Sequence, residues 1–135
     1  MTRYLLDTNI VSQLIRGNEA VARRIRAVPM SSLFISAITE GELLFGLARR
    51  PEATRLHLAV REFLRRVDAL PWDGSSAERY GILRAEMTRS GKMLAPLDLL
   101  IAAHALSLGA VLVTNDRAFA QVEGLMIEDW QNPRD

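Results

Sequence analysis

Short apolar runs alternate with amphipathic segments of helical period along almost the whole chain. Apolar side chains at three- and four-residue spacing indicate helices, whereas apolar runs of three or four residues between turn-forming residues indicate buried strands. These patterns predict five strands, over residues 4–6, 33–35, 69–72, 110–113 and 125–127. They predict helices over residues 8–16, 19–28, 38–50, 51–67, 74–90 and 97–108, and one helical turn near residue 119.

The alternation of strands and helices predicts the fold class. Strands joined through helices pair in parallel, and such sheets are covered on both faces. We therefore expect an α/β protein with three α/β/α layers around a central parallel sheet of four to five strands. The strand at 69–72 contains Pro71, which places it at an edge of the sheet. No linker-like change in composition interrupts residues 1–135, so we expect a single domain.

Composition narrows the class of protein. The chain is 49% hydrophobic and 24% charged, which excludes disorder and fibrous repeats, and it has no cysteine, which excludes disulfides and thiol chemistry. Asp7 interrupts the first apolar run too early for a signal peptide, and Asp98 and His104 break the most apolar stretch, residues 97–113. We therefore expect a cytoplasmic protein without a membrane segment.

Acidic residues follow several of the predicted strands. Asp7 ends the first strand, Asp116 follows the fourth by three residues, and Asp98 lies in the first turn of the helix that begins after Pro96. Ligands bind beyond the carboxyl ends of parallel strands, so these acids are candidate site residues. Helix capping is the competing interpretation of each acid taken alone. Asp73, which follows the edge strand, is the weakest candidate.

The helix after the second strand supplies a further acid, either Glu40 or Glu42. Helical residues two positions apart point about 200° apart, so only one of them faces the other acids, and periodicity leaves the choice open. Clustered carboxylates in apolar segments are costly unless something compensates their charge. Oxygen ligands without cysteine favour Mg²⁺ or Mn²⁺ as that compensation.

The residues around these acids resemble the motifs of the PIN-domain ribonucleases. Residues 5–9, Leu-Leu-Asp-Thr-Asn, and residues 35–46 resemble the first two motifs, and residues 95–105 and 113–119 resemble the later two. Within that superfamily the chain is similar to the VapC toxins of bacterial toxin–antitoxin pairs. The resemblance covers nearly the whole chain, including the Glu128-Asp129-Trp130 ending.

The resemblance implies a site and a reaction. The family pattern Thr-x-x-Glu-Leu-x-x-Gly matches residues 39–46, which selects Glu42 over Glu40. The implied activity is a metal-dependent endoribonuclease, using Mg²⁺ or Mn²⁺ and leaving 5′-phosphate and 3′-hydroxyl ends. The implied catalytic and metal-binding acids are Asp7, Glu42, Asp98 and Asp116, with Thr114 as an accessory hydroxyl and Asn9 as a polar residue lining the site.

The resemblance also implies partners. VapC-type toxins inhibit translation and growth, most often by cutting tRNA, and a VapB-type antitoxin neutralises them. The antitoxin places a basic side chain near the acids, and operator DNA is contacted only through it. The same resemblance implies a homodimer.

The near-neutral net charge is an average over two opposed sets of residues. The chain has 17 basic and 16 acidic residues, a net charge of +1, but without the four candidate acids 12 acidic residues remain. Sixteen of the basic residues are arginine, which suits bidentate contacts to phosphate. We expect Arg49 and Arg50 to contact RNA phosphates, with a solvated helix face as the competing interpretation.

One function from a different class competes with this prediction. A catalytically silent RNA-binding or scaffold module would share the PIN fold and the arginine-rich surface. The four intact acids argue against it, because a module that only binds RNA gains nothing from a cluster of repelling charges.

Overall fold

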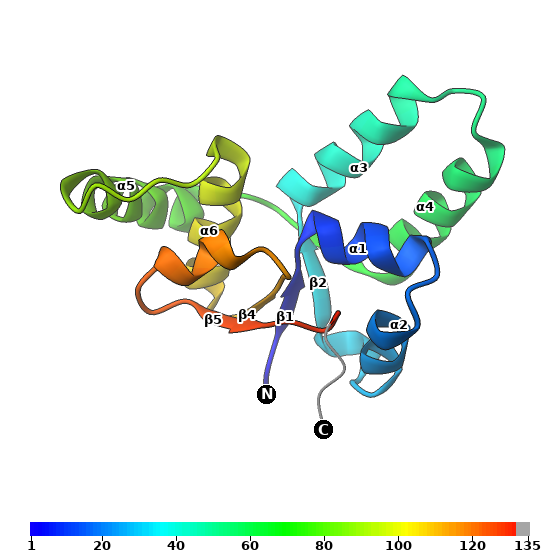
Figure 1. Cartoon of the computed structure of the whole chain (residues 1–135), viewed down its shortest axis with the longest axis horizontal. Helices are drawn as coiled ribbons and strands as arrows, with labels where there is room; N and C mark the ends of the chain where they lie inside the picture. Colours follow the sequence, from blue (N-terminus) through cyan, green and yellow to red (C-terminus); the bar gives the residue numbers. More distant parts are fainter. Residues whose placement is uncertain (132–135) are drawn as a thin grey trace.

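A five-stranded, wholly parallel sheet lies at the centre of the computed structural model, which describes residues 1–131 (Figure 1). The strand order is β3-β2-β1-β4-β5. The predicted fold class is thereby confirmed, and β3 lies at an edge as predicted, although the strand ends at Leu70 and Pro71 follows it. The strands are β1 Tyr4–Leu6, β2 Leu33–Ser36, β3 Asp68–Leu70, β4 Val111–Val113 and β5 Met126–Glu128.

Six α-helices cover this sheet within residues 1–131, each within about two residues of its predicted range except at the start of α4. None of them combines the length and apolarity needed to cross a membrane. They are α1 Thr8–Ile15, α2 Glu19–Arg26, α3 Ala37–Arg49, α4 Thr54–Arg66, α5 Gly74–Arg89 and α6 Pro96–Leu108. Two short 3₁₀ helices, Met30–Ser32 and Arg117–Gln121, precede β2 and follow β4.

The start of α4 was predicted wrongly. The helix begins at Thr54 and not at Pro51. Proline disfavours the α conformation in the residue before it, and Arg50 leaves the helical region with φ −132° and ψ 65°. A turn closed by the Ala53 N–H, which donates to the Arg50 carbonyl over 3.1 Å, therefore separates α3 from α4.

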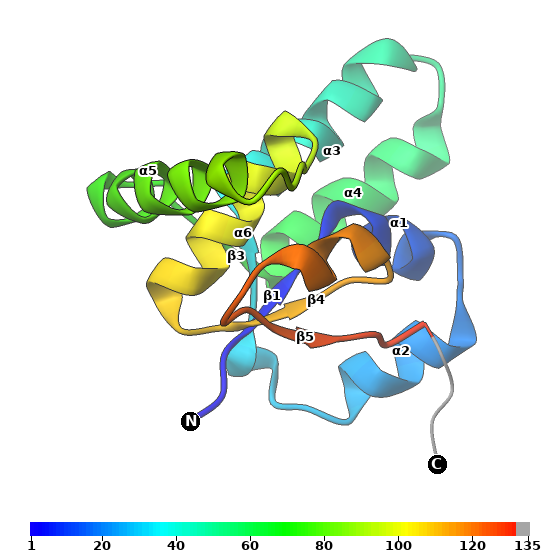
Figure 2. The ribbon, with the colours of Figure 1, turned by 60° about the vertical axis from the view of Figure 1, so that its left-hand side comes forward.

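The sheet separates two cores, and alternate strand residues pack into one or the other. Helices on both sides of the sheet give the expected three layers (Figures 1 and 2). Leu6, Ile35 and Val113 pack with the helices α1 to α4 on one face. Leu5 and Leu112 pack with α5 and α6 on the other. A sheet buried on both faces explains why the strands are continuous apolar runs.

The order of the strands places a switch point between β1 and β4. The chain passes from β1 to β2 and β3 on one side, then crosses to β4 and β5 on the other. The register pairs Leu6 with Val113, so the residues that follow them, Asp7 and Thr114, emerge side by side. In such sheets the crevice at the switch point is where ligands bind.

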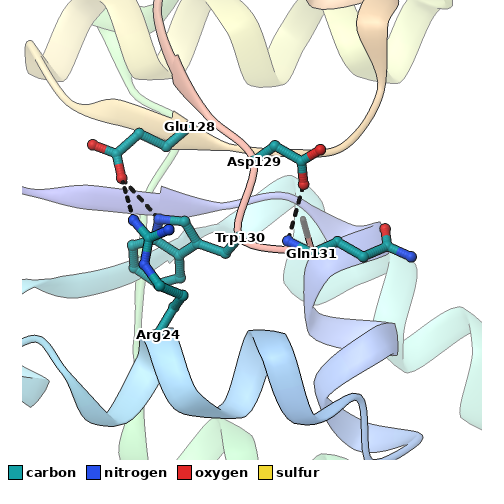
Figure 3. Close-up of polar contacts among 5 residues, drawn as sticks. All are labelled: Arg24, Glu128, Asp129, Trp130 and Gln131. Carbon is teal, nitrogen blue, oxygen red and sulfur yellow. Dashed lines mark hydrogen bonds and ion pairs between the residues drawn. The ribbon is translucent and has the colours of Figure 1, made fainter. Parts of the chain in front are cut away.

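The segment after β5 is anchored to the sheet by Trp130 (Figure 3). Trp130 is fully buried, and its ring lies 5.0 Å from the ring of Tyr4. Its Nε1–H donates to Glu128 Oε1 over 2.8 Å, and the same oxygen pairs with Arg24 at 3.1 Å. The Arg24 guanidinium lies 5.3 Å from the centre of the indole ring. Strand β5, helix α2 and β1 are joined through this one side chain.

Candidate active site

Asp7 occupies the switch point with both carboxylate oxygens engaged. It directly follows β1, is 3% exposed and forms the N-cap of α1. The Thr8 backbone N–H donates to Oδ1 over 2.8 Å, and the Thr114 hydroxyl donates to Oδ2 over 2.8 Å. Asp7 can therefore both cap a helix and belong to the site, because one oxygen caps α1 while the other faces the end of β4.

The environment of Asp7 disfavours its negative charge. Burial raises the pKa of Asp7 to about 6, although the hydrogen bonds from Thr114 and Thr8 oppose that rise. The negative charges of Asp98 and Glu42 raise the pKa further. A carboxylate with this balance is stabilised by any cation that enters its surroundings.

Glu42, on α3, is held against the same helix start. Its Oε1 accepts a hydrogen bond from the Thr8 hydroxyl over 2.6 Å. Its charge acts on both Asp7 and Asp98, whereas Glu40 is not among the charges that shift the pKa of either acid. The structure thus favours Glu42 over Glu40, a choice that periodicity left open.

Asp98 and Asp116 complete the group of coupled acids. The pKa of Asp98, in the first turn of α6, is raised by burial and then by the charges of Asp116 and Glu42. Asp116 caps the 3₁₀ helix after β4, where its Oδ1 accepts from the Ala118 N–H over 2.9 Å. The Asp116 N–H donates to the Thr114 hydroxyl over 3.1 Å. Thr114 therefore links the first acid to the last.

The acids are coupled without forming a closed ligand cage. Within residues 1–131, no three acidic or histidine side chains are arranged to hold one metal ion together. Hydrogen bonds occupy both oxygens of Asp7 and one oxygen each of Glu42 and Asp116. The donor chemistry nevertheless fits Mg²⁺, which is usually held by one or two carboxylates and completes its shell with water and substrate phosphate.

Two other residues considered from the sequence lie apart from this group. Asn9 is exposed in the first turn of α1, and no side-chain interaction within the described part of the chain joins it to the acids. Asp73 caps α5, where its Oδ1 accepts from the Ser76 N–H over 3.3 Å. Helix capping is a sufficient explanation for Asp73, and the proposed role of Asn9 as a residue lining the site stays a prediction.

Arginines line a groove that begins at the acids. The groove encloses about 220 Å³ between α1, α3 and α4, and Thr8 and Glu42 form part of its wall. Arg49 and Arg50, which the sequence proposed for phosphate contacts, line it too. Arg16 also lines the groove, although no pattern in the sequence singled it out. Only the packing of α1 against α3 reveals that Arg16 belongs to this surface.

A buried histidine fixes the start of the helix that carries Glu42. His104, on α6, is 1% exposed, and its Nδ1 lies 2.8 Å from the Ser36 hydroxyl. Ser36 caps α3 by accepting from the Ile38 N–H over 3.1 Å. Burial lowers the pKa of His104, which favours a neutral ring. His104 therefore connects the helices of Asp98 and Glu42 structurally.

Comparisons with known proteins agree with the resemblance in the sequence. Residues 4–125 match the family model of the PIN domain. The chain is 39% identical over 132 residues to the tRNA(fMet)-specific endonuclease VapC of Shigella flexneri, an alignment that covers 96% of this chain and 99% of that protein. It is 33% identical over 131 residues to Ribonuclease VapC2 of Haemophilus influenzae, covering 96% and 99%.

Solved structures show the same fold over the same length. The crystal structure of DNA-bound VapBC from Salmonella typhimurium matches with a TM-score of 0.89 and 36% identity, over 96% of this chain and 99% of that one. VapBC2 from Rickettsia felis, bound to a DNA fragment from its promoter, matches with a TM-score of 0.88 and 28% identity, again over 96% and 99%. The chain therefore belongs to the PIN-domain family and, within it, to the VapC ribonucleases.

Proposed function

We propose that this protein is an endoribonuclease toxin that cuts RNA phosphodiesters with Mg²⁺ or Mn²⁺ held by Asp7, Glu42, Asp98 and Asp116. One observation carries the proposal: four acids from four different elements are electrostatically coupled at the switch point of the sheet. A silent binding module would gain nothing from a buried carboxylate whose charged form is disfavoured. The metal-ion chemistry of phosphodiester cleavage requires such a cluster.

Different residues of the chain have different roles in the proposed reaction. When bound, a divalent ion neutralises phosphate charge and acidifies water. One or two of the four acids would hold it directly and the others through water, while Thr8 and Thr114 fix the orientation of the carboxylates. Asp7 is the most restricted of the acids, because both its oxygens accept hydrogen bonds. The remaining acids are less buried and are the ones that substrate and solvent reach.

Attraction of RNA to an acidic site needs positive charge nearby. Arg16, Arg49 and Arg50 line the groove that includes Glu42, so phosphates flanking the cut bond have a basic path toward the acids. The Shigella flexneri relative is named as specific for tRNA(fMet). We propose tRNA as the substrate class of this chain as well.

Glu42→Gln is expected to lower RNA cleavage by at least about 100-fold, because the amide removes a negative charge from the ion site. Glu40→Gln is the matched control, since it makes the same change two residues away on α3, and it should stay within about twofold of the unaltered protein. The measurement is cleavage of a tRNA panel, initiator tRNA included, in Mg²⁺, in Mn²⁺ and after chelation. Equal activity of both variants and the unaltered protein would remove the enzyme proposal.

A second groove fits the expected antitoxin. It encloses about 460 Å³ between α1, α2 and α4, and its wall is mostly apolar, with charged residues at the rim. Both structural relatives described above are VapBC complexes bound to DNA. We propose that an amphipathic segment of a VapB-type antitoxin binds here and that operator DNA is contacted through the antitoxin. The lining residues are Leu14, Ile15, Ile25, Arg26, Met30, Ala59, Glu62, Phe63, Arg66 and Val67.

Met30→Glu is expected to reduce co-purification of the co-expressed antitoxin by about tenfold or more, because a charge enters an apolar interface. Met126→Glu, on the outer strand β5, is the control, since Met30 is 48% exposed and Met126 is 50% exposed. If both variants retain the antitoxin equally, the groove is not its binding site.

Light scattering on the purified toxin checks the expected homodimer, which a monomeric mass would contradict.

A further inference from the structure

We propose that Thr8 is a positioning residue that holds Asp7 and Glu42 together in the arrangement the site requires. This inference deepens the proposed function and rests on it. The resemblance assigns an accessory role to Thr114, and nothing in the family pattern singled out Thr8. Within residues 1–131, Thr8 is the one residue that donates to two of the four acids through two different groups, its backbone N–H and its hydroxyl.

The two bonds come from the backbone and from the side chain. The Thr8 N–H donates to Asp7 Oδ1 over 2.8 Å. This N–H lies at the first position of α1, where it has no acceptor within the helix and is available for the cap. The Thr8 hydroxyl donates to Glu42 Oε1 over 2.6 Å, a short bond of the kind that a charged acceptor makes.

A third side chain supports the hydroxyl. Thr39 is fully buried on α3, one turn before Glu42, and its hydroxyl lies 3.2 Å from that of Thr8. The Thr8 hydroxyl is placed to donate to either oxygen, and because it has one proton, the 2.6 Å contact with Glu42 is the stronger of the two. Thr8 is also β-branched, which restricts its side-chain torsion. The direction of the hydroxyl is therefore fixed from two sides.

The arrangement opposes a repulsion inside the site. Glu42 and Asp7 carry like charges that act on each other, and a glutamate has three rotatable side-chain bonds through which to move away. Thr8 lies between the two acids and donates to both. On the other side of Asp7, Thr114 donates to its second oxygen and accepts from the Asp116 N–H. Two threonines thus connect Glu42, Asp7 and Asp116 in one chain of hydrogen bonds.

Thr8→Val tests the inference, because valine keeps the branched shape and the backbone N–H and removes only the hydroxyl. We expect kcat to fall by about 10- to 100-fold while KM for RNA stays within about twofold, as for the loss of a residue that orients a metal ligand. In the RNA-free protein, the Mn²⁺ concentration that gives half the maximal thermal stabilisation should rise by about tenfold or more. Thr8→Ser, which keeps the hydroxyl, should restore both quantities to within about threefold.

Thr54→Val is the matched control, since Thr54 is likewise the first residue of a helix, α4, and is exposed away from the site. It should change neither kcat nor the Mn²⁺ midpoint.

Thr8→Ala is a second variant without the hydroxyl, used if valine lowers the melting temperature of the metal-free protein. Valine and alanine variants with an unaltered Mn²⁺ midpoint would overturn the proposal, as would a serine variant impaired as much as valine. Absence of RNA cleavage by the unaltered protein would overturn the proposed function alone, because the Mn²⁺ titration tests Thr8 without RNA.

Discussion

Replacing Asp7 by Asn is expected to abolish RNA cleavage and to stabilise the metal-free protein at neutral pH. Asp7 is 3% exposed, and burial raises its pKa from 3.8 to about 6. When folding raises the pKa of an acid, that acid's contribution to the free energy of unfolding is fully present below its unfolded pKa, here 3.8, where it is protonated in both states. That stability is lost as the pH rises through about 6. Asparagine stays neutral throughout and keeps an oxygen with which to cap α1.

The expected gain follows from the difference in pKa. A rise from 3.8 to about 6 corresponds to about 3 kcal/mol in the free energy of unfolding at pH 8. The difference in stability between Asp7→Asn and the unaltered protein should shrink as the pH falls below about 6 and be largely lost by pH 4. Urea unfolding without metal, at intervals from pH 4 to pH 8, measures this difference directly.

Asp73→Asn provides the control, because Asp73 also caps a helix but is exposed. Its replacement removes an exposed charge and not a buried one, so no stabilisation at pH 8 is expected. Saturating Mn²⁺ should reduce or reverse the difference in free energy of unfolding between Asp7→Asn and the unaltered protein, because the ion stabilises only a protein that binds it. A difference that stays constant from pH 4 to pH 8, or a variant less stable than the unaltered protein at pH 8, would contradict the buried-charge account of Asp7.

Local patterns predicted the elements that carry the site, because each depends on neighbours in sequence. The apolar runs located the strands, and the acids that follow the strands located Asp7 and Asp116. The edge position of β3 was predicted from Pro71, which the structure places directly after the strand. The start of α4 was missed because Pro51 was taken as a first helical residue, whereas it acted on the residue before it.

Contacts between distant segments could not be predicted from local patterns. Glu42 and Thr8 are 34 residues apart, and Thr114 and Asp7 are 107 residues apart. Residue spacing alone cannot show that a hydroxyl will lie between two acids, so periodicity left Glu40 and Glu42 equal. Arg16 was overlooked for the same reason, since it joins the groove only after α1 packs beside α3.

Trp130→Ala is expected to lower the free energy of unfolding by about 3–5 kcal/mol, the usual loss for a large buried aromatic side chain. Trp130 is fully buried and packs against Tyr4 of β1. The Arg24 guanidinium of α2 lies against the same indole ring (Figure 3). The ring fills the space between the sheet and α2, so its removal leaves a cavity. Trp72 remains as the fluorescent reporter for unfolding in urea, since the chain has only two tryptophans.

Two milder variants separate the buried ring from the polar contacts around it. Trp130→Phe keeps a ring but removes the Nε1–H that donates to Glu128, and should cost about 1–2 kcal/mol. Arg24→Gln removes an ion pair whose side chains are 38% and 39% exposed, and should cost about 1 kcal/mol or less. A larger loss from Arg24→Gln than from Trp130→Ala would mean that the ion pair, and not the ring, holds this end of the chain.

The loss of stability in Trp130→Ala should also disturb the active site, because β5 contacts Thr114. The Glu128 carbonyl accepts the Thr114 N–H over 3.0 Å, so loosening of β5 frees the residue that links Asp7 to Asp116. We expect RNA cleavage by this variant to fall steeply with temperature and to approach that of the unaltered protein in the cold, where the folded fraction recovers. Asp7→Asn should show no such recovery at any temperature, because it removes the acid and leaves the scaffold intact.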